Sequence, residues 1–331
     1  MDVSLKTATW KYNKTWVYSA TYDEGLIELH RFTVPAHDRL CVPGHVEVVG
    51  GHLGVERRLG ASSYNGMRHM SGGEIRELLD RGWGVGNHSW SHGIVEDDLE
   101  LELKKSKDAI EEACRYPVTL YTAPGSNVNM SPPVLEALPK YGYLGGMGIT
   151  DDINRPDFGI WINRPPLHEK FSDLYDSAFD PYKRIAQAKK HNGWIVDYLH
   201  CPLEKAVHDY KDVSAAHLGE RLETVVAEGK YDCWFANPDR VADYRYMRGA
   251  VKILEKGPGR FELDISAARK EIVCKDLTFI MESNYPAGQL AVSADGRDVS
   301  VQQFANGEVV FTIAVKHKMV IDIIPRNIRI A

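Results

Sequence analysis

The chain lacks any long apolar run. Its first residues, Met1 to Lys6, contain neither the basic segment nor the hydrophobic segment that directs export. No stretch of the 331 residues stays apolar over the length that a membrane-spanning helix needs. We therefore expect a cytoplasmic protein that contacts no membrane.

Cysteine is scarce, and charge of one sign is not concentrated anywhere. The five cysteines are odd in number and widely spaced, which argues against a disulfide framework and for reduced thiols. The formal net charge is −6 and no basic run occurs, so nothing indicates binding to nucleic acid. The hydrophobic share of 44% and the charged share of 26% are those of a soluble globular protein.

The region from residue 16 to about 250 alternates strand-like and helix-like segments. This alternation predicts a parallel α/β sheet or barrel. A capping box at Ser71 and Glu74 marks the start of one of its helices. We count about seven βα units, fewer than the eight of a regular barrel, and predict an irregular (β/α) barrel. The clearest strand candidates are residues 16–22, 83–86, 118–121, 194–199 and 233–236.

The chain after residue 250 has a different pattern. Six strand-like runs follow one another with turns between them and no helical pattern. We therefore predict two domains, a catalytic one over residues 1–250 and a small antiparallel β domain over residues 251–331, for which a sandwich is one arrangement. Self-association of the protein into a homo-oligomer is one role open to this β domain.

Two histidines, His88 and His92, lie four residues apart after the strand candidate at 83–86. Two imidazoles at this spacing are able to close on one divalent cation, and the serines between them are small. The alternative is a pair of histidines in a surface loop. The glycine-rich strand before them and the acidic pair described next favour the metal site.

The acidic pair is Asp23 and Glu24, at the end of the strand candidate at 16–22. Adjacent acids before a glycine are common in exposed turns, and that alternative remains open. Here they end an apolar and aromatic run, where burying two like charges is costly without a cation. Loops at the carboxyl ends of strands are where α/β folds place their chemistry.

These motifs resemble those of one family. Residues 21–25, Thr-Tyr-Asp-Glu-Gly, resemble the first motif of the polysaccharide deacetylases, carbohydrate esterase family 4, which is usually Thr-Phe-Asp-Asp-Gly. Residues 88–92, His-Ser-Trp-Ser-His, match the second motif in spacing. Residues 198–200, Tyr-Leu-His, resemble the late Leu-x-His segment without its intervening residue. The similarity covers roughly residues 16–250.

The resemblance implies a role for each matching residue. Asp23 would be the general base, while Glu24, His88 and His92 would bind the metal, most simply Zn, with Co or Ni possible. His200 would be the general acid, because an imidazole can be charged near neutral pH. The alternative for His200 is a histidine at a strand end that bonds to a backbone carbonyl.

The chain also departs from the family pattern. Glu24 replaces an aspartate, which adds one methylene between the backbone and the metal. The third motif normally begins with an arginine that orients the catalytic aspartate, and here Thr122 stands in its place. Arg164 is a candidate substitute, with a surface-loop arginine as the alternative.

Four residues are candidates for contact with the substrate. Gly125 could offer its backbone N–H to an oxyanion, with Pro124 beside it. Trp90 could stack on a sugar ring, although structural packing is the alternative. The fourth candidate is Arg164.

The resemblance implies a metal-dependent deacetylase acting on an acetylated saccharide or glycan precursor, on an N-acetyl rather than an O-acetyl group. Two alternatives remain. One is hydrolysis of a non-sugar C–N bond, as in a cyclic amide or ureide. The other is a saccharide-binding protein with a decayed centre, which the missing arginine suggests.

Overall fold

The computed structural model describes residues 3–167, 183–208, 212–284, 289–304 and 308–325. The chain divides into two compact units, one of Trp16–Val241 and one of Met1–Thr15 with Ala242–Ala331. We call them the barrel unit and the β unit. This grouping differs from the predicted boundary at residue 250, because strand β1 (Val3–Thr7) pairs antiparallel with β12 (Asp276–Ser283) and so joins the N-terminal segment to the β unit.

The barrel unit is built on a parallel sheet in the order β7-β6-β5-β4-β3-β2-β8, with β9 beside the first half of β2. Backbone bonds between Leu167 and Tyr198, and between Tyr198 and Pro165, join the segment after β7 to β8 and nearly close the ring. The predicted irregular barrel of about seven units is therefore confirmed. The strands are β2 (Trp16–Glu24), β3 (Gly44–Val48), β4 (Gly84–Asn87), β5 (Leu120–Thr122), β6 (Gly145–Ile149), β7 (Trp161–Arg164), β8 (Trp194–Leu199) and β9 (Cys233–Phe235).

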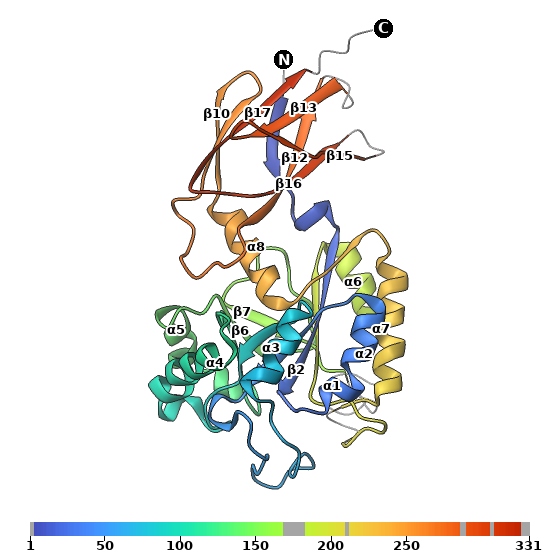
Figure 1. The fold of residues 1–331 in the computed structure, drawn as a ribbon, viewed down its shortest axis with the longest axis vertical. Helices are drawn as coiled ribbons and strands as arrows, with labels where there is room; N and C mark the ends of the chain where they lie inside the picture. The colour runs from blue at the N-terminus through green and yellow to red at the C-terminus, as the bar shows by residue number, and fades with distance from the viewer. Residues whose placement is uncertain (1–2, 168–182, 209–211, 285–288, 305–307, 326–331) are drawn as a thin grey trace. The chain divides into compact units, whose positions relative to one another are not determined.

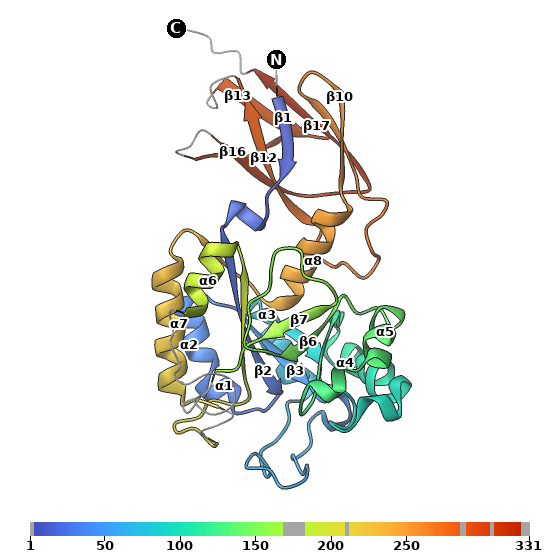
Figure 2. The ribbon, with the colours of Figure 1, turned by 180° about the vertical axis from the view of Figure 1, so that it is seen from behind.

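Helices surround this sheet (Figures 1 and 2). The helix α3 begins at the predicted capping box, where Ser71 accepts from the Glu74 backbone N–H and the Glu74 side chain returns to the Ser71 N–H. The helices are α1 (Leu29–Phe32), α2 (Val34–Leu40), α3 (Gly72–Asp80), α4 (Ser106–Cys114), α5 (Pro132–Lys140), α6 (Lys183–His191), α7 (Ala215–Gly229) and α8 (Pro238–Ala250), which crosses the unit boundary. The remaining helical segments are the 3₁₀ turns η1 (Lys11–Asn13), η2 (Gly50–His52), η3 (Val95–Asp97) and η5 (Asn127–Met130) and the π-helical segment η4 (Glu100–Lys105).

The β unit contains two antiparallel sheets, as the strand pattern after residue 250 predicted. One has the order β1-β12-β16-β15 and the other β10-β11-β17-β13-β14. The strands not yet given are β10 (Lys252–Gly257), β11 (Arg260–Asp264), β13 (Leu290–Ala294), β14 (Arg297–Val299), β15 (Gln302–Gln303), β16 (Val309–Ala314) and β17 (Lys318–Pro325). Among the described residues, no helix is long and apolar enough to cross a membrane.

The register of the parallel strands determines where chemistry is placed. Glu24 at the end of β2 pairs with Val48 of β3, and Val48 pairs with Asn87 of β4. Every residue of β2 is buried, because the strand has β8 on one side and β9 and β3 on the other. The carboxyl ends of these strands therefore meet at one edge of the barrel, directly beside the two predicted motifs.

Candidate functional site

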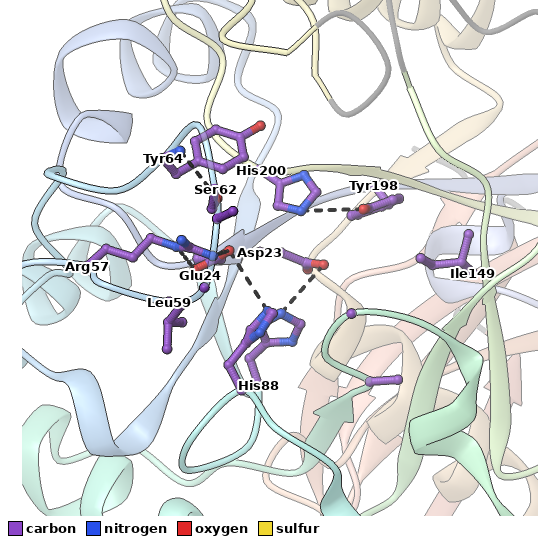
Figure 3. Close-up of a pocket in the computed structure, with 15 residues that line it drawn as sticks. Asp23, Glu24, Arg57, Leu59, Ser62, Tyr64, His88, Ile149, Tyr198 and His200 are labelled. Carbon is purple, nitrogen blue, oxygen red and sulfur yellow. Dashed lines mark hydrogen bonds and ion pairs between the residues drawn. The ribbon is translucent and has the colours of Figure 1, made fainter.

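A cavity of about 400 Å³ opens at this edge of the barrel. Its volume is within the range of small-molecule sites. Figure 3 shows two carboxylates in the middle, with imidazoles on either side. The ionisable side chains that line it are Asp23, Glu24, Arg57, His88, His92, Tyr64, Tyr198 and His200.

Asp23 is held from behind by Arg164. The guanidinium donates to both carboxylate oxygens of Asp23, with Nη1 at 2.6 Å and Nη2 at 3.2 Å, and both side chains are buried. Burial raises the pKa of Asp23, but the charge of Arg164 opposes it, and the net pKa is lowered. Asp23 is therefore ionised at neutral pH.

Glu24 is held in the same manner by a different arginine. Arg57 donates to both carboxylate oxygens through Nε and, at 2.6 Å, through Nη2. Burial raises the pKa of Glu24, but the Arg57 hydrogen bonds and the nearby charges outweigh it and lower the pKa to about 2. The φ of Glu24 is 75°, so the chain leaves the strand conformation at this residue.

The histidine pair faces the two carboxylates. The rings of His88 and His92 lie 5.0 Å apart, centre to centre, and both Nε2 atoms point toward the acids. His88 Nε2 lies 3.8 Å from Asp23 Oδ2, and His92 Nε2 lies 3.9 Å from Glu24 Oε1. Burial lowers the pKa of His88 to about 4, so its ring is neutral at pH 7. His88 Nδ1 bonds to the Thr122 carbonyl at 3.1 Å, which leaves Nε2 with its lone pair.

His200 lies on the other side of the carboxylates, beyond the end of β8. Its ring stacks on Tyr64 at 5.3 Å between centres, and its Nε2 lies 3.5 Å from the Tyr198 hydroxyl (Figure 3). The Tyr64 hydroxyl donates to the buried Asp212 at 3.3 Å. Burial raises the pKa of Asp212 to about 7. The imidazole is thus positioned by packing against one tyrosine and by contact with another.

The donor chemistry fits a divalent cation in part. The two histidine Nε2 atoms face a gap bordered by carboxylate oxygens, which is the type of donor set that Zn²⁺ prefers. Within the described ranges, however, no three His, Cys, Asp or Glu side chains form a group that could hold a metal ion. The predicted third ligand, Glu24, is instead bonded through both oxygens to Arg57.

The predicted substrate-binding residues are not all at the cavity. Gly125 lines it, with a φ of 69°, whereas Pro124 is absent from the lining. The Trp90 backbone N–H donates to Glu102, and the Trp90 ring lies against Gly51, which corresponds to the packing alternative. Arg164 is fully buried behind Asp23, so it is neither a substrate contact nor the surface arginine of the alternative.

Sequence reasoning missed three residues of the site. Arg57 lies in a run of charged residues, Glu56 to Arg58, which is typical of a solvated loop. Tyr64 and Asp212 have no motif around them. Only the positions of these residues in space show that they contact Glu24 and His200, and no local signal could have identified them.

The barrel unit is thus a nearly closed parallel barrel whose cavity, at the carboxyl ends of the strands, is lined by two carboxylates and three histidines. Residues 13–145 match the sequence model of the polysaccharide deacetylases, a stretch that includes Asp23, Glu24 and the histidine pair. This part of the chain therefore has the sequence pattern of the polysaccharide deacetylase family, whose members are typically metal-dependent.

The solved structures that are similar to this chain are distant from it in sequence. A Mycobacterium smegmatis protein assigned to the polysaccharide deacetylases is 17% identical, with a TM-score of 0.45, over 72% of this chain and 92% of its own. The polysaccharide deacetylase Bc1974 from Bacillus cereus is 13% identical, with a TM-score of 0.41, over 67% and 91%. Peptidoglycan deacetylase PdaC from Bacillus subtilis is 16% identical, with a TM-score of 0.39, over 72% and 95%. A search of curated proteins found no significant match.

Proposed function

We propose that this protein is a hydrolase that removes an acetyl group from a saccharide, and an N-acetyl group in preference to an O-acetyl group. The observation that carries the proposal is Asp23. It is a buried, ionised carboxylate held by Arg164, and its Oδ2, which accepts the longer of the two Arg164 bonds at 3.2 Å, lies 3.8 Å from His88 Nε2. The match of residues 13–145 to the deacetylase family supports an acetylated saccharide as the substrate.

In this proposal one residue accepts a proton and another residue donates one. Asp23 accepts a proton from the water that attacks the acetyl carbonyl. His200, on the opposite side of the carboxylates, donates a proton to the nitrogen as the C–N bond breaks. Gly125 supplies a backbone N–H to the oxyanion. The products are acetate and a free amine on the sugar.

The proposal includes a divalent cation at the histidine pair, with Zn as the first choice and Co or Ni as alternatives. His88 and His92 would hold it, together with a carboxylate of the Asp23 and Glu24 pair. When bound, such a cation lowers the pKa of water and polarises the carbonyl. The neutral state of His88 supports ligation, because a protonated imidazole has no lone pair to offer.

The first test is acetate release from N-acetylated and O-acetylated sugars. Treatment with a chelator should abolish it, and added zinc, cobalt or nickel should restore it. Asp23→Asn removes the proton acceptor, so we expect kcat/KM to fall by about 10²–10⁴-fold. Asp38→Asn is the matched control, because that carboxylate is exposed and paired with Arg81.

Full activity of Asp23→Asn would show that the mechanism is wrong. A parallel assay with cyclic amides and ureides separates the alternative C–N hydrolase, since only one class should be turned over. Tight binding of saccharide without turnover by the metal-loaded protein would indicate a decayed centre. The cytoplasmic location and the glycan precursor stay predictions from the sequence.

A further inference from the structure

Arg57 binds Glu24, the side chain that the proposed metal would need as a ligand. It donates through two nitrogens to the two oxygens of Glu24, and both side chains are almost entirely buried. Its Nη1 donates to Asn65 Oδ1 at 2.9 Å. Figure 3 shows the guanidinium pointing from its loop directly at Glu24. Both oxygens of Glu24 therefore already accept a strong, charge-assisted hydrogen bond from the guanidinium.

The loop that carries Arg57 is itself built to hold the guanidinium in place. The Arg57 backbone N–H donates to Met67 at 2.7 Å, and its carbonyl accepts from Gly66 at 3.0 Å. Asn65 Oδ1 also accepts from the Leu59 backbone N–H at 3.0 Å, so one amide anchors both the loop and the guanidinium. Arg57 is therefore a fixed part of the site, unlike a long side chain on an open surface.

The charges of the site balance without a cation. Each carboxylate has its own guanidinium, Arg164 for Asp23 and Arg57 for Glu24. The cost of burying two adjacent acids, which the sequence suggested a metal would relieve, is relieved by two arginines. A cation that took Glu24 as a ligand would leave the Arg57 guanidinium buried without its partner.

We infer that Arg57 competes with the metal for Glu24 and thereby lowers the affinity of the site for divalent cations. The inference rests on the proposed metal centre at His88 and His92 and adds a residue that regulates it. The coupling is reciprocal, so a bound metal also weakens the pairing of Arg57 with Glu24.

The test measures cation binding rather than activity. Zinc and cobalt are titrated into the metal-stripped protein by calorimetry, and Co²⁺ binding is followed by its visible absorption. We expect Arg57→Gln to bind at least about tenfold more tightly than the original protein, a coupling of the usual size. Arg57→Lys keeps a charge without the bidentate geometry and should fall between the two, which also covers a failure of Arg57→Gln to fold.

Two further variants isolate the cause. Arg58→Gln removes a neighbouring charge that is exposed and paired with Glu56, so it should leave the affinity unchanged. In a Glu24→Gln background, Arg57→Gln should bring no gain, because the group for which Arg57 competes is gone.

The outcomes separate the inference from the proposed function. Equal or weaker binding by both Arg57 variants would overturn the competition while leaving the metal centre intact. An equal gain from Arg58→Gln would also overturn it, because long-range charge would then explain the effect. No binding of either cation by any variant would overturn the metal centre, and the competition with it.

Discussion

The two neighbouring carboxylates of the site are each bound by an arginine, but the two arginines come from different parts of the fold. Asp23 and its arginine both lie on strands of the barrel, β2 and β7. Glu24 is the last residue of the same strand but is held by Arg57, which lies in a loop. We call these the strand-built half and the loop-built half. The strand-built half depends on the closure of the whole barrel, whereas the loop-built half depends on a short segment around Asn65.

Because of this difference, the barrel depends more on Arg164 than on Arg57. Arg164 is also within reach of the Thr21 hydroxyl at 3.3 Å, and its guanidinium lies over the Tyr198 ring at 4.7 Å, so neighbouring strands surround it. Arg57 has its loop on one side and the cavity on the other. A substitution at Arg57 therefore alters the chemistry of the site at less cost to the barrel than one at Arg164.

The largest effect is expected for Arg164→Met. It leaves Asp23 buried with no guanidinium, so we expect a loss of about 3–5 kcal/mol in the free energy of unfolding. Without Arg164 the effect of burial dominates and the pKa of Asp23 rises. The acid limb of the pH–activity profile should therefore move to higher pH, and denaturation and pH-dependent kinetics measure the two effects.

Arg221→Met is the matched control for this prediction. Arg221 is equally buried and pairs with Asp197 at 2.8 Å within the same barrel, away from the cavity lining. It should cost similar stability and leave the acid limb in place. The same shift in both variants would mean that Arg164 acts only through stability.

For Arg57→Met we expect a smaller loss in the free energy of unfolding than for Arg164→Met. An equal loss would show that the loop-built half and the strand-built half support the fold equally.

The second prediction concerns the pH dependence of stability at His37, which contacts Tyr22 of β2. His37 Nδ1 donates to the Val42 carbonyl at 2.8 Å, so the neutral ring accepts through Nε2 from the hydroxyl of Tyr22, the residue before Asp23, at 2.6 Å. Burial lowers the pKa of His37 to about 4, although its bond to the Val42 carbonyl opposes this. In the unfolded chain His37 takes up a proton near pH 6.5, whereas in the folded protein it does so only near pH 4. The contribution of the neutral His37 to the free energy of unfolding is therefore complete above pH 6.5 and is lost as the pH falls toward 4.

Comparison with His37→Gln isolates this contribution. The difference in unfolding free energy between the original protein and the variant should shrink by roughly 3 kcal/mol between pH 7 and pH 4. Urea denaturation at a series of pH values measures it. A difference that is constant over this range would mean that His37 is not kept neutral by the fold.

The smallest effect is expected for Tyr64→Phe in the loop-built half. This change removes the hydroxyl that donates to Asp212 but keeps the ring that stacks on His200. We expect a loss of about 1 kcal/mol in stability, the size of one hydrogen bond, with kcat nearly unchanged. Tyr64→Ala also removes the stack and should lower kcat as well. Equal kcat values for the two variants would show that the stack does not position His200.

Local signals were sufficient for much of the fold. The capping box at Ser71 and the buried run of β2 depend on residues that are near one another in the chain, so their patterns predict the elements directly. The pairing of β1 with β12 was missed because its partners are separated by most of the chain. A strand has the same local pattern whichever sheet it joins.

The sequence by itself determined the barrel class and the motifs that carry Asp23, Glu24 and the histidine pair, because spacing along one strand end or loop is a local property. Only the tertiary structure decided that Arg164 lies behind Asp23 and that Arg57 binds Glu24. Both pairs join residues distant in the chain, and a buried charge selects its partner by proximity in space, which spacing in the sequence does not encode.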